Sequence, residues 1–466
     1  MTLTTEHSAA TSEQGESIVV AGRTPEQGRR PSQSGPLAIA LAALDFQDFG
    51  GLEEILVELA IGLQEDGNDV TVYTCTWASH ENQYVRRLRD ANVRLVQPNR
   101  ALSHLAQDWA TKERLLAVLM RCLAPLTFLL AAYDKLVRGK DWRSARHSAF
   151  CWLRGRVGKI ILRDRRPWLA RWTLRADWMR RRPDVIHIHG FTKNLLFLLE
   201  WAARQGPPVV YEEHSTPDER FDWWDGFEAI GKADVVLACS EASAAALRRI
   251  SGTQTAVLPR APLCPDPCAD GQSPPARLKK GPLTVTVIAR LDTAKGLPHF
   301  LEAAAIVRRR RPGTMFRIFG DGQLREELST YASSLGLDAA KILRGRFERS
   351  ELPRIMAETD VWASASLVEG QSIALLEAMA FGCAIVTTNV GGSAEVIEHD
   401  RNGLLCAPGN PEELARAIER VADSAELRRR LGAAARRDYE GGPFQRHQVA
   451  NATAKIYRRL LREKAI

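Results

Sequence analysis

The sequence predicts an α/β protein made of two doubly wound parallel-sheet domains that face each other across a cleft. Its 466 residues exceed what one hydrophobic core usually holds, and a proline-rich polar stretch separates two halves. Strand–loop–helix units recur through both halves. Short, nearly continuous apolar strands that alternate with helices are typical of parallel sheets covered on both faces. Such sheets bind ligands at the carboxyl ends of their strands.

Five segments of the first half have the length and apolar composition of buried strands. The first, residues 37–44, leads through "DFQDFGG" into a helical pattern over residues 52–67, which Gly67 is expected to end as a C-cap. The other four read "DVTVYTC", "DVIHIHG", "PVVYEEH" and "DVVLACS". The second half repeats the alternation with "LTVTVIAR", "MFRIFG", "KILRG", "DVWASA" and "CAIVTTN".

These patterns divide the chain. Residues 1–36 are polar, lack the apolar segment of a signal peptide and are interpreted as a disordered tail. Residues 37–262 form the first domain and residues 282–442 the second. Residues 263–281, dense in proline, link them, and residues 443–466 form a C-terminal helix.

A basic insert is expected within the first domain. Residues 103–182 hold 19 Lys and Arg against 6 Asp and Glu, and six of the eleven tryptophans. Residues 114–136 are apolar but are interrupted by Arg121 and Pro125, which suits an interface better than a membrane span. Cations beside tryptophans favour peripheral contact with an anionic membrane. One alternative is that these helices pack on their own domain. The charge alone would also allow nucleic-acid binding, but we expect no nucleic-acid partner.

The eight cysteines are dispersed, and no CxxC pair or His/Cys cluster indicates a metal site. Cys264 and Cys268 lie close together and are interpreted as loop thiols, with redox activity as the alternative. Dispersed thiols, together with the lack of an apolar run of about 20 residues, favour a cytoplasmic protein. We expect no required metal.

The loop "ARLDTAKG", residues 289–296, follows a strand and precedes a helix. It places Arg290 and Lys295 near the helix N-terminus, where cations oppose the macrodipole. The arrangement makes sense if an anion such as a diphosphate binds there. Two solvated cations are the alternative.

A second loop, "LVEGQS", precedes an apolar helix that contains one carboxylate, Glu377. Glu377 has no Lys or Arg three or four positions away, so its partner must lie outside the helix. Glu369 lies just before the helix, eight residues earlier, which places the two about 12 Å apart in helical geometry and suits two ends of an extended ligand. The alternatives are a favourable N-terminal acid for Glu369 and a tertiary ion pair for Glu377. The backbone N–H groups of Gly370, Gln371 and Ser372 are candidates for anion contact.

Glycines and histidines mark further loops at strand ends. The glycines are Gly50 and Gly51, Gly320 and Gly322, and Gly391 and Gly392. His187 and His189 lie on one face of a predicted strand. We interpret His187 as a core residue and His189, at the carboxyl end, as a site candidate. Glu212, Glu213 and His214 end the next strand and are weaker candidates.

Together these loops resemble those of glycosyltransferase family 4, retaining enzymes of the GT-B fold with two Rossmann-like domains. "ARLDTAKG", "FGDG", "EGQSIALLEAMAFG" with its E-x7-E pair, and "VGGSAEVIEHDRNGLL" occur in that family's order and spacing. The resemblance extends from residue 37 to 464 apart from the basic insert. Family members often have "PNGVD" near the end of the first domain, where this chain has "LPRAPLCPD".

The resemblance implies a role for each matching position. Arg290 and Lys295 would bind the donor diphosphate, Glu369 would contact the transferred sugar, and Glu377 would accept from the ribose hydroxyls. His189 would approach the sugar from the first domain, and the C-terminal helix would cross back onto that domain. Donor contacts would also come from Gly320, Gly322, Gly370, Gln371, Ser372, Gly391 and Gly392, and phosphate or acceptor contacts from Gly50 and Gly51.

The resemblance therefore implies transfer of a sugar from a nucleotide-diphosphate sugar, UDP- or GDP-linked, to a glycan or lipid-linked acceptor, as in cell-surface polysaccharide or glycolipid synthesis. No protein nucleophile is implied. The alternatives are a GT-B epimerase or phosphorylase, and a catalytically silent nucleotide-sugar binder that acts as a scaffold.

Overall fold

The computed structural model describes residues 35–43, 46, 51–98, 100, 118, 122–138, 153, 176–178, 180–190, 199–214, 216, 227–260 and 282–464. Most of residues 1–36 and of the insert at 103–182, and all of the linker at 263–281, lie outside these ranges, as do Gly50, Cys264 and Cys268.

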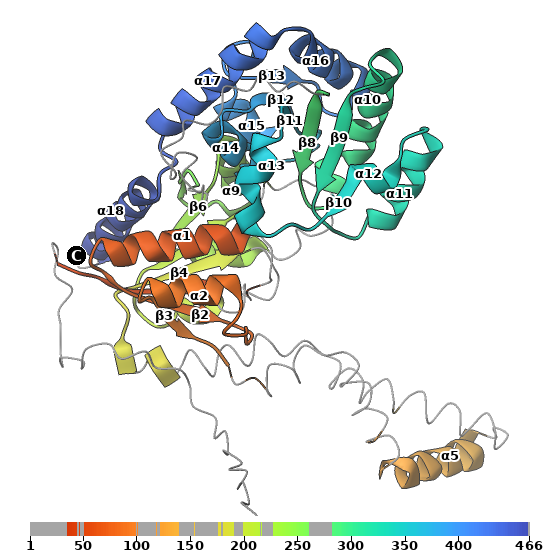
Figure 1. Ribbon diagram of the computed structural model, residues 1–466. Coiled ribbons are helices and arrows are strands. Elements are labelled where there is room, and N and C mark those ends of the chain that lie inside the picture. Colours follow the sequence, from red (N-terminus) through yellow and green to blue (C-terminus); the bar gives the residue numbers. More distant parts are fainter. Residues whose placement is uncertain are drawn as a thin grey trace, which may run out of the picture.

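Two parallel sheets organise the described chain (Figure 1). The first has the strand order β3-β2-β1-β4-β5-β6-β7 and the second β10-β9-β8-β11-β12-β13. Each is doubly wound, because its chain starts in a central strand and reaches both edges. The predicted fold class is confirmed.

The first sheet contains β1 (Ala38–Ala43), β2 (Asp69–Thr74), β3 (Arg94–Val96), β4 (Val185–Gly190), β5 (Val209–Glu213), β6 (Val235–Ala238) and β7 (Thr255–Val257). Its helices are α1 (Gly51–Glu65), α2 (Gln83–Asp90), α9 (Glu241–Ser251) and the 3-10 helix η2 (Phe227–Lys232). Strands β4, β5 and β6 are buried along their whole length, as both faces of a covered parallel sheet require. Gly67, at φ 84°, follows α1 as the predicted stop.

The second sheet contains β8 (Thr284–Ile288), β9 (Met315–Phe319), β10 (Leu343–Gly345), β11 (Val361–Ala363), β12 (Ala384–Thr388) and β13 (Leu404–Cys406). Its helices are α10 (Leu297–Arg310), α11 (Arg325–Ser334), α12 (Ala339–Ile342), α13 (Leu352–Ala357), α14 (Ile373–Ala380), α15 (Gly391–Val396), α16 (Pro411–Asp423) and α17 (Ala425–Gly441), with η3 (Thr293–Lys295) and η4 (Arg349–Glu351). The strand predicted at "KILRG" is shorter, because Asp338 caps α12 and draws Lys341 and Ile342 into that helix.

The last helix, α18 (Arg446–Lys464), packs against α1 of the first sheet (Figure 1). Val449, Ala450 and Tyr457 of α18 belong to the same hydrophobic core as β1 and α1. A Cβ on Gly62 would lie 2.9 Å from the Cβ of Ala450, so the glycine permits the close approach of the two helices. The C-terminal segment is therefore part of the first domain's core.

Buried acids on α1 bind cations from two other helices. Glu54 and Glu58 are each 2% exposed. Arg87 of α2 contacts both, with its Nη1 3.0 Å from Glu54 Oε1, and Arg446 of α18 places its Nε 2.7 Å from Glu58 Oε2. Burial, with a smaller contribution from the charge of Glu54, raises the pKa of Glu58, and the two arginines oppose this.

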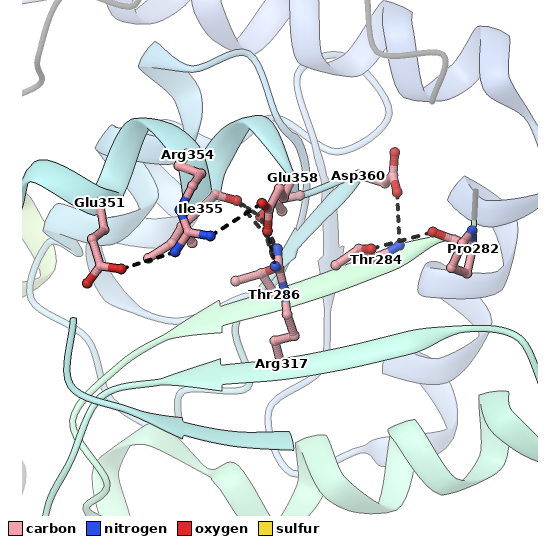
Figure 2. A network of polar contacts seen from close by, with 10 residues as sticks. Pro282, Thr284, Thr286, Arg317, Glu351, Arg354, Ile355, Glu358 and Asp360 are labelled. Atoms are coloured by element: carbon pink, nitrogen blue, oxygen red, sulfur yellow. Dashed lines mark hydrogen bonds and ion pairs between the residues drawn. The ribbon is translucent and has the colours of Figure 1, made fainter. Parts of the chain in front are cut away.

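A buried arginine holds the second sheet to α13 (Figure 2). Arg317 of β9 donates through Nη1 to Glu358 Oε2 at 2.7 Å and through Nη2 to Thr286 Oγ1 of β8 at 3.2 Å. The contacts fix the end of α13 against two strands, and α13 follows directly after η4.

Of the helices that the structure describes, none combines the length and apolar character that crossing a bilayer requires. Helix α5 (Ala124–Arg138), from the basic insert, lies apart from both sheets in Figure 1.

Candidate active site

Four of the predicted loops lie together at the carboxyl ends of β8, β9, β11 and β12. Backbone hydrogen bonds join them: Leu367 N donates to Ala294 O at 2.8 Å, Leu291 N to Asp321 O at 3.0 Å, and Gly392 N to Gly370 O at 2.9 Å. Because these bonds join backbone atoms, the contacts between the loops do not depend on the identity of their side chains.

Lys295 and Glu369 form an ion pair across two of these loops. Lys295 Nζ donates to Glu369 Oε2 at 2.7 Å, and Ser366 Oγ donates to the same oxygen at 3.2 Å. The side chains are 17% and 10% exposed, so the pair is partly shielded yet reachable. Arg290, in the same loop, is 62% exposed and has its Nη2 3.1 Å from Asp292 Oδ2. Lys295 is therefore paired with Glu369, and the exposed Arg290 of the same loop lies beside Asp292.

The predicted helix start is confirmed at α14, whose N-cap Ser372 accepts from Leu375 N at 3.3 Å. Gln371 is buried and tied to the first domain: Arg260 N donates to Gln371 Oε1 at 2.8 Å, and Arg260 Nη1 donates to Gln371 O at 3.0 Å. Arg260 also donates to the backbone oxygen of His214. It belongs to the segment in which this chain differs from the usual "PNGVD".

The partner of Glu377 is Arg349 of η4. Arg349 Nη2 lies 2.7 Å from Glu377 Oε1, and the carboxylate is buried at 1% exposure. The tertiary ion pair that the sequence left as an alternative is therefore present, and a ribose would have to share Glu377 with Arg349. The ribose contact stays a prediction. Burial raises the pKa of Glu377, and Arg349 lowers it.

The predicted glycines are positions where backbones touch. A Cβ on Gly320 or Gly322 would collide with the backbone oxygen of Ala289 or Leu291, and a Cβ on Gly391 or Gly392 with that of Glu369 or Gly370. Gly320 and Gly391 also have φ values of 136° and 43°, which favour glycine. The glycines therefore let the four loops pack on one another.

Gly51 brings the first domain to this site. It opens α1, and a Cβ there would lie 3.6 Å from Cγ1 of Ile373, the first residue of α14. Thr216 Oγ1 donates to Glu369 O at 3.2 Å, and the Glu395 carboxylate accepts from Glu241 N and Ala242 N at 2.9 Å each. The two domains thus meet directly around Glu369.

His189 lies in a buried cluster of ionisable groups. Its Nδ1 is 3.2 Å from His214 Nε2 and 3.6 Å from Glu212 Oε2, while His187 Nε2 is 3.3 Å from that oxygen. His187 Nδ1 is 2.6 Å from the Tyr457 hydroxyl of α18, so His187 is the core residue predicted. His189 is fully buried. Its side chain could therefore act on a ligand only through the residues that surround it.

Burial lowers the pKa of His187 and of His189 to about 3. Among the described residues, His187, His189 and Glu212 have ligand atoms close enough to share a cation. Tyr457 contacts His187 Nδ1 and His214 contacts His189 Nδ1, while His187 Nε2 and Glu212 Oε2 have no hydrogen-bond partner among the described residues. The expectation of no required metal stays a prediction.

This cluster predicts a fall in stability with acid. In the unfolded chain the imidazoles of His187 and His189 take up protons near pH 6.5, whereas in the folded chain they stay neutral down to about pH 3. The unfolded state then binds more protons, so the free energy of unfolding falls as pH drops below about 6.5, by about 1.4 kcal/mol per unit and histidine. Glu212, whose pKa burial raises, acts the opposite way.

Thermal denaturation at pH 5, 6 and 7 would measure the effect. We expect a falling Tm in the wild type and a shallower fall in His187→Gln. The control is His399→Gln, whose side chain is 52% exposed. Equal slopes in all three proteins would contradict the assignment.

Several site residues carry no signal in the sequence. Arg349, Arg260, Thr216 and Glu395 lie in ordinary polar segments, and only the fold brings them to the predicted loops. Tyr457 is 270 residues from His187. A helical apolar pattern places Tyr457 in a core but does not say which strand it meets.

Comparison with known proteins agrees with the fold. The family described as "Glycosyl transferases group 1" matches residues 271–438, and "Glycosyltransferase Family 4" matches residues 134–261. A glycogen synthase of Mycobacterium tuberculosis is 31% identical over 181 residues, which is 39% of this chain and 44% of that protein. The matched part of this chain thus spans less than half the length of that relative.

A 2-deoxystreptamine glucosyltransferase of Streptomyces kanamyceticus is 28% identical over 351 residues, 66% of this chain and 86% of that protein. The crystal structure of HepE from Anabaena in complex with UDP and glucose has a TM-score of 0.60 at 18% identity, covering 90% of this chain and 99% of that one. The two family matches lie one in each half of the molecule and together cover more than half of it. The chain therefore belongs to the GT-B glycosyltransferases of the group 1 and family 4 type.

Proposed function

We propose that this protein transfers a sugar, with retention of configuration, from a nucleotide-diphosphate sugar to a glycan or lipid-linked acceptor. The observation that carries the proposal is the Lys295–Glu369 pair, 2.7 Å apart where four loops meet, with the exposed Arg290 in the same loop as Lys295. Cations there suit a diphosphate, and a carboxylate suits the hydroxyls of a sugar. The complex of HepE with UDP and glucose supports UDP as the nucleotide, and GDP is the second candidate.

In the proposed reaction, the bond between the anomeric carbon and the β-phosphate oxygen breaks and a bond to the acceptor oxygen forms. The acceptor proton passes to the departing phosphate, which needs no protein nucleophile. Negative charge grows on the diphosphate as it leaves, and Lys295 and Arg290 would stabilise it because they are already in place. Glu369 would hold the sugar hydroxyls, and His189 would line the opposite side.

The test is incubation of the protein with UDP-, GDP- and ADP-sugars, first by thermal shift and then with oligosaccharide and lipid-linked acceptors. We expect one nucleotide to raise the Tm and one donor to give a product whose new linkage keeps the donor's anomeric configuration by NMR. Free nucleotide with an epimerised sugar would instead favour the epimerase. Binding without turnover of any acceptor would favour the silent scaffold.

We further propose that α5 contacts an anionic membrane and brings the enzyme to a lipid-linked acceptor. Leu126, Leu129, Tyr133 and Leu136 recur at helical spacing on α5 and are 41%, 65%, 56% and 84% exposed. The surrounding insert is strongly basic. Sedimentation with anionic vesicles should be weakened by Leu129→Glu and by high salt. Equal sedimentation of variant and wild type would contradict it.

A further inference from the structure

Arg349 and Glu377 form an ion pair in a buried site, although they lie on different elements. Glu377 is 1% exposed on α14, and its helical neighbours include no cation. Arg349 reaches it from η4 with 2.7 Å between Nη2 and Oε1. An ionised carboxylate at such a place is costly without a charged partner, so Arg349 decides its protonation state.

Other charged groups face this pair from the first domain. Glu54 of α1, 2% exposed, acts on both members: its negative charge favours the Arg349 cation and opposes ionisation of Glu377. Arg87 of α2 partly offsets Glu54, with its Nη1 3.0 and 3.1 Å from the two carboxylate oxygens. Tyr84 of α2 also acts on Arg349. Without Arg349, burial and Glu54 would both push Glu377 toward its neutral form.

The position of Arg349 is itself fixed. Glu348 N donates to Glu351 Oε2 at 2.9 Å, which closes a capping box around η4. Helix α13 follows at once and is held at its far end by Arg317 (Figure 2). The side chain of Arg349 thus starts from a backbone that is anchored on both sides.

We propose that Arg349 is a positioning residue for donor binding, which keeps Glu377 ionised and aimed so that it can accept from the ribose hydroxyls. The inference rests on the proposed function, since it concerns the nucleotide of the same donor. A carboxylate accepts hydrogen bonds at both oxygens, whereas a protonated carboxyl uses one oxygen as a donor and fits a vicinal diol less well. Glu54 belongs to the other domain, so the charge balance of the Arg349–Glu377 pair also depends on the contact between the two domains.

The experiment is titration calorimetry with UDP at pH 6, 7 and 8.5, or with GDP or ADP if that nucleotide gives the thermal shift. Each variant's Kd is divided by the wild-type Kd at the same pH, because the terminal phosphate of the nucleotide itself titrates at about pH 6. A ratio that does not change with pH is a flat profile. Arg349→Gln should bind about tenfold or more weakly at pH 6 and recover as the pH rises and Glu377 ionises. Arg349→Lys, which keeps a cation, should restore most of the flat profile.

Two controls separate this role from a general structural one. Arg344→Gln removes an exposed arginine of β10 nearby and should leave the Kd unchanged at every pH. Glu377→Gln should bind weakly at all three pH values, and adding Arg349→Gln to it should cause no further pH-dependent loss.

The proposal is overturned if Arg349→Gln binds as the wild type does, or more weakly by one factor at every pH. A wild-type protein that binds none of the three nucleotides would overturn the proposed function, and this inference with it. If Arg349→Gln does not fold, Arg349→Lys decides: a Kd close to that of the wild type at all three pH values supports the role of the charge, and a Kd that is weaker by one factor at every pH overturns it.

Discussion

Replacing Lys295 with alanine should lower kcat for sugar transfer by about 10²–10³-fold, the usual cost of removing one preorganised group that meets developing charge. Lys295 Nζ is held at 2.7 Å from Glu369 and is only 17% exposed, so its charge is weakly screened. Lys295 ends η3, and Gly296 follows it at φ 57°, packed so closely on Ala365 O that a Cβ there would collide with that oxygen.

The change should affect kcat more than KM, since the charge on the departing phosphate grows in the transition state. Steady-state rates with the donor identified by thermal shift would measure it. Lys341→Ala is the matched control, because that lysine is 81% exposed and lies on α12, away from the four loops. If Lys295→Ala kept more than a tenth of the wild-type kcat, Lys295 would not be the cation that meets the leaving group.

The architecture of this site could be predicted from the sequence because parallel sheets obey strong rules. Apolar strands alternating with helices place every strand's carboxyl end on one edge of its sheet, so the loops after β8, β9, β11 and β12 had to lie near one another. Lys295 and Glu369 were therefore expected in one site, although 74 residues separate them. Glycines at the loop ends signalled close backbone approach without saying which loop they would meet.

The contacts between domains could not be predicted in this way. Glu54, with Arg87 bound to it, acts on Glu377 because of how the two sheets are docked, and nothing periodic in the sequence encodes that docking. A local rule showed that Glu377 lacked a partner, but it could not choose among the chain's 64 Lys and Arg residues. Thr216 and Arg260 likewise look like ordinary loop residues until they reach Glu369 O and Gln371 O.

Gly391→Ala should reduce kcat/KM by about 10²-fold or more without unfolding the protein, because it displaces a catalytic loop by an atom's width. The added Cβ would overlap Glu369 O, which is backbone and cannot rotate away. A φ of 43° adds strain for any residue with a Cβ. Relief requires the 369–372 segment to move, and Glu369 would then lose its alignment with Lys295 and with Thr216 of the other domain.

Gly313→Ala is the matched control, since a Cβ there meets nothing within 4 Å and its φ is not in the left-handed region. Circular dichroism should show both variants folded, and donor kinetics should separate them. The expected pattern is wild-type activity for Gly313→Ala and a loss in both kcat and donor affinity for Gly391→Ala, because the shifted segment carries Glu369 and the N–H groups of Gly370 to Ser372 together. A loss confined to donor affinity would mean that the loop contacts the nucleotide but does not position the sugar. Full activity would show that the 369–372 backbone can move without loss of catalysis.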